Sequence, residues 1–264
     1  MTHTAISSIL TLLALLAFSA TLLASNKGQS TLKQLVAFSV GTFTTVYWIW
    51  SRDWGLGLPT ALLASVLATE IAFGLILLRL REALQLGSIL GPYLFIACLM
   101  VLWADAGRGS EATQPHITGW LAAHIGAAVL SYGFVTIGAI AGLGIIMRER
   151  DLNRRTRGGL TDRLPSIAVA EATELIGLTA AEIVLGIGII FGIAAEYTTT
   201  GAFFQITHKS LFSIAAFAVI GGLLILHLRT GLRGRLAARI GLSAYLLVSL
   251  GYPGVKFVGE ILLA

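Results

Sequence analysis

The chain has 264 residues, of which 56% are hydrophobic and only 12% are charged. A soluble protein carries about a quarter charged residues, so this composition excludes a water-soluble globular protein and indicates a membrane protein. The net charge of +5 comes from basic residues in a few short loops and does not indicate a nucleic-acid-binding surface. The single cysteine, Cys98, excludes a disulfide framework, a CxxC redox motif and a CxxCH haem-attachment site.

Apolar runs of about twenty residues predict eight transmembrane helices, so we expect an all-α polytopic membrane protein with one transmembrane domain over residues 1–264. The first run has no basic residue before it and is followed by Lys27 and Lys33, the opposite of the flank order of a signal peptide. We therefore interpret it as a membrane helix whose N-terminus is outside. The predicted spans are residues 5–25, 34–51, 56–78, 85–104, 117–147, 173–195, 208–228 and 240–261.

The basic residues alternate between the two sides of this layout. Fourteen of the eighteen Lys and Arg residues fall in inner segments, and only Arg52, Arg108, Lys209 and Lys256 fall in outer ones. Short cytoplasmic loops of membrane proteins are enriched in Lys and Arg, so the bias supports this orientation. It predicts that both termini are periplasmic.

Acidic residues within the apolar runs invite a functional hypothesis, because a charged group in hydrocarbon is costly. Glu70 in the third span and Glu182 in the sixth are isolated, with no basic residue at a comparable depth. They could form a proton or cation path, or they could be hydrogen-bonded carboxyl groups packed between helices. Pro165 suits a helix start, and Glu171 and Glu174, which follow it, indicate an interfacial approach before the sixth span.

Three histidines occupy defined heights on the predicted helices. His124 lies 24 residues before Arg148, and His208 lies 21 residues before Arg229, which corresponds to roughly 36 Å and 31 Å of helix. Because both arginines mark the inner face, His124 and His208 are expected near the same outer height, where two imidazoles could ligate a haem iron. His227 lies at the inner face, close to Arg229. A zinc site is less favoured, because no carboxylate or cysteine accompanies the histidines at fixed spacing.

Two blocks of sequence resemble a known family. They are HIGAAVLSYGFVTIGAIAGLGIIMRERDLNRR, followed by LPSI, and HKSLFSIAAFAVIGGLLILHLRTGLRGRLAARIGLSAYLLVSLGY. Both are similar to the cytochrome c assembly (CcsA/CcmC-type) membrane proteins that handle haem, and most similar to their YpjD-like branch of bacterial inner-membrane proteins. The resembling part covers residues 111–264.

The resemblance implies a multi-pass protein of the bacterial inner membrane with haem as its cofactor. It places His124 at the first external haem-ligating position and His227 at a histidine proposed to hold haem in transit, while His208 stands where the YpjD-like branch commonly has a histidine–lysine pair. Histidine ligands for the haem iron would then be His124, His208 and His227. Apocytochrome or other assembly proteins are the implied partners, beside the lipid bilayer and without nucleic acid.

The chain departs from the cytochrome c synthases of this family at two places. The tryptophan-rich WWD segment is replaced by AAEYTTTGAFFQIT, and YPGVKFVGEILLA stands where those synthases have a second external histidine. We therefore expect a haem-binding chaperone that assists cytochrome c assembly rather than an enzyme. The alternatives are a transporter that uses Glu70 and Glu182, and a structural or regulatory membrane subunit.

Overall fold

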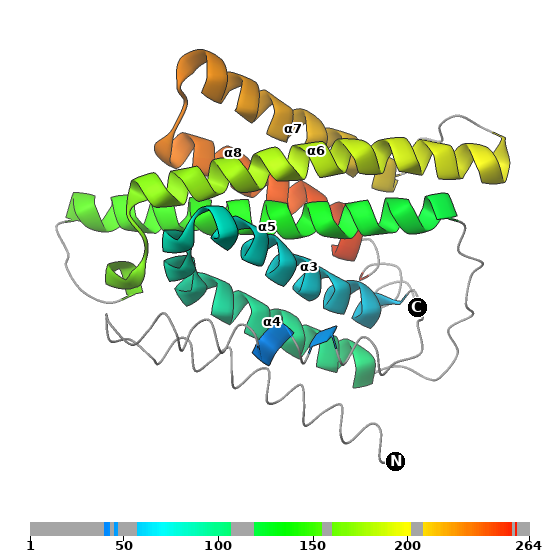
Figure 1. The fold of residues 1–264 in the computed structure, drawn as a ribbon, viewed down its shortest axis with the longest axis horizontal. Coiled ribbons are helices and arrows are strands. Elements are labelled where there is room, and N and C mark those ends of the chain that lie inside the picture. Colours follow the sequence, from blue (N-terminus) through cyan, green and yellow to red (C-terminus); the bar gives the residue numbers. More distant parts are fainter. Residues whose placement is uncertain are drawn as a thin grey trace.

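A computed structural model describes residues 40–42, 45, 46, 57–106, 119–154, 160–201, 208–254 and 257. The described part of the chain is helical and contains no strand (Figure 1). Its elements are α3 (Leu58–Arg79), η1 (Arg81–Leu86), α4 (Gly87–Ala106), α5 (Gly119–Arg154), η2 (Leu160–Arg163), α6 (Ile167–Thr200), α7 (His208–Thr230), α8 (Gly234–Ser249) and η3 (Leu250–Gly254), of which η3 is a π-helical turn.

Six helices in the described ranges are long and apolar enough to cross a membrane. They correspond to the last six of the predicted spans, which confirms a helical polytopic protein. The predicted span 5–25 lies outside the described residues, as does most of 34–51. The total of eight spans and the location of the two termini therefore stay predictions.

Two helix starts differ from the prediction. The sixth span was predicted from residue 173, whereas α6 is continuous from Ile167, close to the predicted helix start at Pro165, with the Ser166 hydroxyl accepting a hydrogen bond of 3.3 Å from the Val169 amide. The interfacial location of its first turns stays a prediction. The acidic residues do not end the helix, since Glu174 faces inward and is only 5% exposed. Helix α8 begins at Gly234, with Arg235 in its first turn, rather than at residue 240. In the first turns of α6 and α8, polar side chains can belong to the helix because they face protein or the interface rather than lipid.

Helix α5 is the centre of the bundle and packs against α3, α6 and α8 (Figure 1). Every residue of α5 from Ser131 to Gly142 is buried. A helix that is apolar all round must be shielded from water by lipid or by protein, and the middle of α5 is shielded by its neighbours. Its neighbours therefore form a shell whose outer faces carry the exposed apolar side chains.

Glycines bring these helices into close contact. A methyl group on Gly133 would overlap the backbone carbonyl of Ala68, so α3 and α5 touch backbone to backbone at this point. Helices α5 and α6 run antiparallel and keep one register, with Gly188 against Ala127 near one end and Gly142 against Glu174 near the other. Small residues at helix contacts are the usual solution in membranes, where close van der Waals packing holds the helices together.

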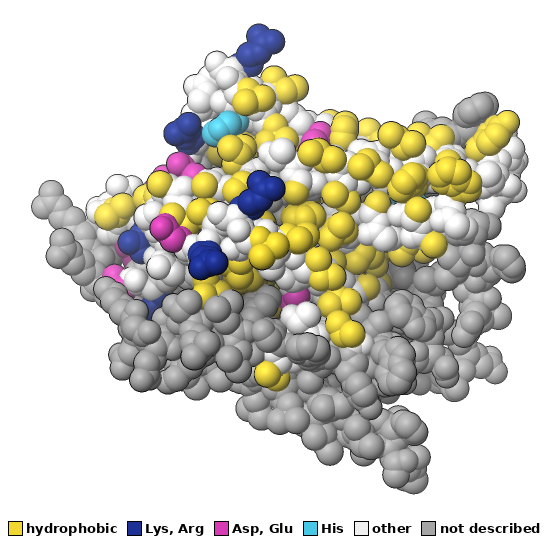
Figure 2. Space-filling view, viewed as in Figure 1, with side chains coloured by type: hydrophobic (Ala, Val, Ile, Leu, Met, Phe, Trp, Pro, Cys, Tyr) yellow, Lys and Arg dark blue, Asp and Glu magenta, His cyan; other side chains and the backbone are white. Residues whose placement is uncertain are grey.

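The arginines of the described residues lie towards one end of the bundle, and hydrophobic side chains predominate among the other described residues of the face shown in Figure 2. At this end the Arg148 guanidinium donates hydrogen bonds to the carbonyl oxygens of Thr161 and Leu164, at 2.7 and 2.8 Å. Arg235 pairs with Glu149 at 3.6 Å. The ten arginines in the described ranges all belong to the segments that meet here: Arg79, Arg81, Arg148, Arg150, Arg154, Arg163, Arg229, Arg233, Arg235 and Arg239.

Candidate functional site: a histidine-lined cavity between α5, α6, α7 and α8

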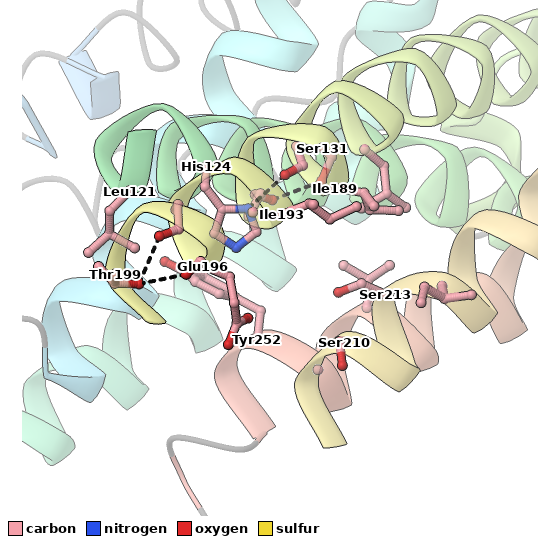
Figure 3. Close-up of a pocket in the computed structure, with 18 residues that line it drawn as sticks. Leu121, His124, Ser131, Ile189, Ile193, Glu196, Thr199, Ser210, Ser213 and Tyr252 are labelled. Atoms are coloured by element: carbon pink, nitrogen blue, oxygen red, sulfur yellow. Dashed lines mark hydrogen bonds between the residues drawn. The ribbon is translucent and has the colours of Figure 1, made fainter. Parts of the chain in front are cut away.

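A cavity of about 450 Å³ lies at the end of the bundle away from the arginines. Its walls are the first turns of α5, the C-terminal half of α6, the first turns of α7 and the segment where α8 passes into η3 (Figure 3). Ligand-binding pockets commonly measure about 300–1,000 Å³, so the volume suits a small molecule or cofactor. Most of the lining residues are aliphatic or small.

His124 projects from α5 into this cavity (Figure 3). Its Nδ1 atom lies 2.7 Å from the carbonyl oxygen of Gly188 on α6. A carbonyl oxygen can only accept, so Nδ1 carries the hydrogen and donates it. In the neutral imidazole the other nitrogen, Nε2, then keeps its lone pair, which is the state of a histidine that ligates a metal ion.

Two glycines of α6 make room for this ring. A methyl group on Gly192 would lie 2.9 Å from Nδ1 of His124 and 3.0 Å from its Cε1 atom. A methyl group on Gly188 would lie 3.2 Å from the side chain of Ala127, one turn from His124. The four-residue spacing places both glycines on the face of α6 that meets α5. The local sequence of α6 is therefore what lets the imidazole reach a backbone carbonyl.

Polar groups are few and stand around the histidine. Glu196 and Thr199 come from the last turns of α6, and Ser210 and Ser213 come from the first turns of α7 (Figure 3). Tyr252 of η3 completes this side of the wall. The cavity thus combines an apolar interior with an imidazole, a carboxyl group and several hydroxyl groups.

His208 is the first residue of α7, and its side chain lies outside the described residues. Ser210, in the same turn, lines the cavity that His124 also lines. The backbone of His208 therefore lies within one helical turn of a residue that lines the cavity of His124. Ligation of one haem iron by both imidazoles stays a prediction.

His227 lies in the last turn of α7, at the arginine end, so it does not belong to the cavity of His124. Its Nδ1 atom is 2.9 Å from the carbonyl oxygen of Leu232 and bridges the turn between α7 and α8. The small cavity beside it, of about 30 Å³, has room for about one water molecule. Its role as a haem ligand in transit stays a prediction.

The acidic residues singled out in the sequence lie elsewhere. Glu70 of α3 is 2% exposed, and its Oε1 atom lies 3.5 Å from the Thr45 hydroxyl, which donates a shorter hydrogen bond of 2.9 Å to the Gly41 carbonyl oxygen. Glu182 of α6 faces Gly221 of α7. Neither lines the cavity beside His124. Glu174 is buried between α5, α6 and α8, where its Oε1 atom lies against Gly142 and makes no hydrogen bond to any described residue.

Sequence reasoning did not identify Glu196, Ser210, Ser213 or Tyr252 as part of the site. Ser213 and Tyr252 stand among apolar residues, Ser210 follows Lys209, and nothing in their spacing relates them to His124. One signal was present: Gly188 and Gly192 lie four residues apart in GIGIIFG, a pattern typical of close helix contact.

Comparison with known proteins identifies the family. The sequence profile of the cytochrome C assembly protein family matches residues 2–263, so the match includes the N-terminal part in which no specific motif was found. An uncharacterised 28.8 kDa protein from the 5′ region of a nifR3-like gene of Azospirillum brasilense is 41% identical over 215 residues, which cover 80% of this chain and 78% of that protein.

A second relative is the cytochrome c biogenesis protein CcsA of Prochlorococcus marinus (strain MIT 9301). It is 22% identical over 182 residues, which cover 62% of this chain and 59% of CcsA. No solved structure matches the chain. The profile match over nearly the whole length places this chain in the cytochrome c assembly protein family.

Proposed function

We propose that this protein binds haem in the bacterial inner membrane and assists the assembly of cytochrome c or another haem protein. The observation that supports this most directly is the hydrogen bond from His124 Nδ1 to the Gly188 carbonyl oxygen, which leaves Nε2 available to an iron atom in the cavity. Family membership supports a role in cytochrome c maturation. The protein acts as a haem chaperone, and no thioether-forming step is assigned to it.

The residues present suit a haem group. A buried backbone acceptor on the second imidazole nitrogen fixes the tautomer and the ring orientation of metal-ligating histidines and raises their basicity. The aliphatic wall, with Leu185, Ile189 and Ile193, suits the apolar macrocycle. When bound, haem would supply an iron that imidazole nitrogens can ligate, and His124 and His208 would be the residues that hold it.

The orientation of the protein follows from its charges. The arginine end is proposed to be cytoplasmic, because basic segments resist translocation. The cavity of His124 then opens on the periplasmic side, where an apocytochrome or another assembly protein can approach it. His227 would hold haem transiently at the opposite side of the membrane.

Haemin titration of the purified protein tests the proposal. We expect wild-type protein to develop a Soret band characteristic of histidine-ligated haem, and His124→Ala to lower the affinity by tenfold or more. Exogenous imidazole should restore the band in His124→Ala, because it can occupy the space of the lost ring. Such rescue distinguishes ligation from a structural role.

Glu182→Gln is the matched control, since Glu182 lies on α6 but does not line the cavity. It should bind haemin as the wild type does. A wild-type protein that takes up no haemin, or a His124→Ala variant with unchanged affinity and spectrum, would contradict the proposal. Solute uptake that depends on Glu70 or Glu182 would favour the transporter alternative.

A further inference from the structure

The connection between α7 and α8 carries a dense positive charge at the arginine end of the bundle (Figure 1). Residues 227–239 include four arginines and no acidic residue. Only residues 231–233 separate the two helices, so the arginines stand on two helix ends and one short loop. Residues 227–239 are called the basic turn below.

Contacts from side chains and two glycines hold the backbone of the basic turn in one conformation. The Gly234 amide donates a hydrogen bond of 2.9 Å to a carboxyl oxygen of Glu171 on α6. Nδ1 of His227 lies 2.9 Å from the carbonyl oxygen of Leu232. Gly231 and Gly234 both have a φ of 69°, a left-handed conformation that other residues rarely adopt. The turn therefore presents its side chains from a defined backbone rather than from a flexible linker.

Three of the four arginines have no partner within the described part of the chain. Arg229, Arg233 and Arg239 are exposed, and none of them makes a hydrogen bond or an ion pair to a described residue. The fourth arginine, Arg235, pairs with Glu149 of α5 at 3.6 Å. The charge of three guanidinium groups is therefore available to a ligand from outside the chain.

Apolar side chains beside these arginines place the basic turn at the membrane surface. Leu228, in the last turn of α7, is 82% exposed, and Leu236, in the first turn of α8, is 56% exposed. Both helices are long and apolar enough to cross a membrane. The two leucines therefore face acyl chains, while the long arginine side chains reach the headgroup layer. Anionic phospholipids are the ligands that a basic segment meets in that layer.

We propose that the basic turn binds the headgroups of anionic phospholipids. The phosphate oxygens accept hydrogen bonds from Arg229, Arg233 and Arg239, and the acyl chains lie against Leu228 and Leu236. Guanidinium groups suit this ligand, because their planar fork of N–H donors matches the oxygen atoms of a phosphate group. The proposal goes beyond haem handling and does not depend on it.

Glu171 distinguishes binding at a formed site from a general attraction between opposite charges. It is a positioning residue: its carboxylate repels an anionic headgroup, but its hydrogen bond to the Gly234 amide holds the turn. Glu171→Gln removes the charge and keeps an oxygen that can accept this hydrogen bond, whereas Glu171→Ala removes both. A formed site predicts that Glu171→Gln binds at least as well as the wild type and that Glu171→Ala binds less. Charge alone predicts that both variants bind more.

Native mass spectrometry of the full-length protein, titrated with lipid in detergent, tests the site. The probes are dioleoylphosphatidylglycerol, which is anionic, and dioleoylphosphatidylcholine, which has the same acyl chains and no net charge. We expect the wild type to retain phosphatidylglycerol preferentially. Arg229→Gln/Arg233→Gln/Arg239→Gln should lower the affinity for it by tenfold or more, since each arginine near a membrane surface contributes a factor of roughly five.

The matched control is Arg79→Gln/Arg81→Gln/Arg154→Gln, which removes three exposed arginines from the same end of the bundle. It should bind phosphatidylglycerol nearly as the wild type does. Equal losses in the two triple variants would overturn the proposal, because they would show a diffuse effect of charge. Equal retention of the two lipids by the wild type would overturn it too, as would equal binding by Glu171→Ala and Glu171→Gln. The readout does not involve haem, so the proposal can fail while haem binding at His124 stands, and the reverse.

Discussion

The imidazole of His124 and the backbone carbonyl of Gly188 meet at 2.7 Å across two antiparallel helices. This contact connects a residue near the start of α5 with the C-terminal half of α6. It exists because the face of α6 opposite the ring carries glycine. The predictions below test that contact, the packing of the bundle and its orientation in the membrane.

Gly192→Ala should weaken haem binding although it replaces none of the histidines that are proposed to ligate the iron. The new methyl group would lie 2.9 Å from His124 Nδ1, so the ring has to move away from the Gly188 carbonyl. Loss of such an orienting partner typically costs about 10–100-fold in metal affinity. Haemin titration of the variant measures the effect.

Gly126→Ala is the matched control for this substitution. Gly126 lies on α5 within a turn of His124, and a methyl group there meets nothing within 4 Å. Haemin affinity should stay at the wild-type value. Equal affinities in Gly192→Ala and wild type would show that the ring does not depend on the glycine.

Gly133→Ala should destabilise the bundle by about 2–3 kcal/mol, the upper range for overpacking a tightly packed core. The added methyl group overlaps the Ala68 carbonyl group, and backbone cannot turn aside as a flexible side chain can. Thermal unfolding in detergent, followed by circular dichroism, measures the change. Gly74→Ala on α3 has open space around it and should be neutral or slightly stabilising.

Cysteine accessibility should show that the arginine end faces the cytoplasm. Cys98 is the sole cysteine of the sequence, so Cys98→Ala provides a cysteine-free background. In that background Thr200→Cys, at the end of α6 near the His124 cavity, should react with a membrane-impermeant maleimide in intact cells. Asn153→Cys, near the end of α5, should react only after lysis. The reverse pattern would invert the proposed topology.

The existence of the described helices was predictable from the sequence, because apolar runs of sufficient length have no other stable form in a bilayer. Their ends were less predictable. A hydropathy scale counts Glu174 as polar whichever way its side chain points. It therefore could not show that α6 begins before Glu174 and that this side chain is buried in the protein. The same scale cannot separate a leucine that faces lipid from one that faces another helix, since the two environments are equally apolar.

The candidate site was predicted in part. His124 stood out because an imidazole in an apolar run is unusual, and its height followed from the distance to Arg148. The partner of its ring did not, because a backbone carbonyl leaves no trace in the sequence. The contact between the hydroxyl groups of Tyr93, Tyr132 and Tyr245 was hidden for a different reason: these tyrosines come from three helices, and only the packing of the helices brings the hydroxyl groups together.

The unbroken register between α5 and α6 restricts how a molecule as large as haem can reach His124. These two helices pack closely at glycines from Gly188 near one end to Gly142 near the other, so a large molecule could pass between them only by breaking this contact. The opposite boundary of the cavity is formed by the first turns of α7 and the η3 turn. We therefore expect haem to reach His124 from the side of α7 and η3, with the contact between α5 and α6 kept.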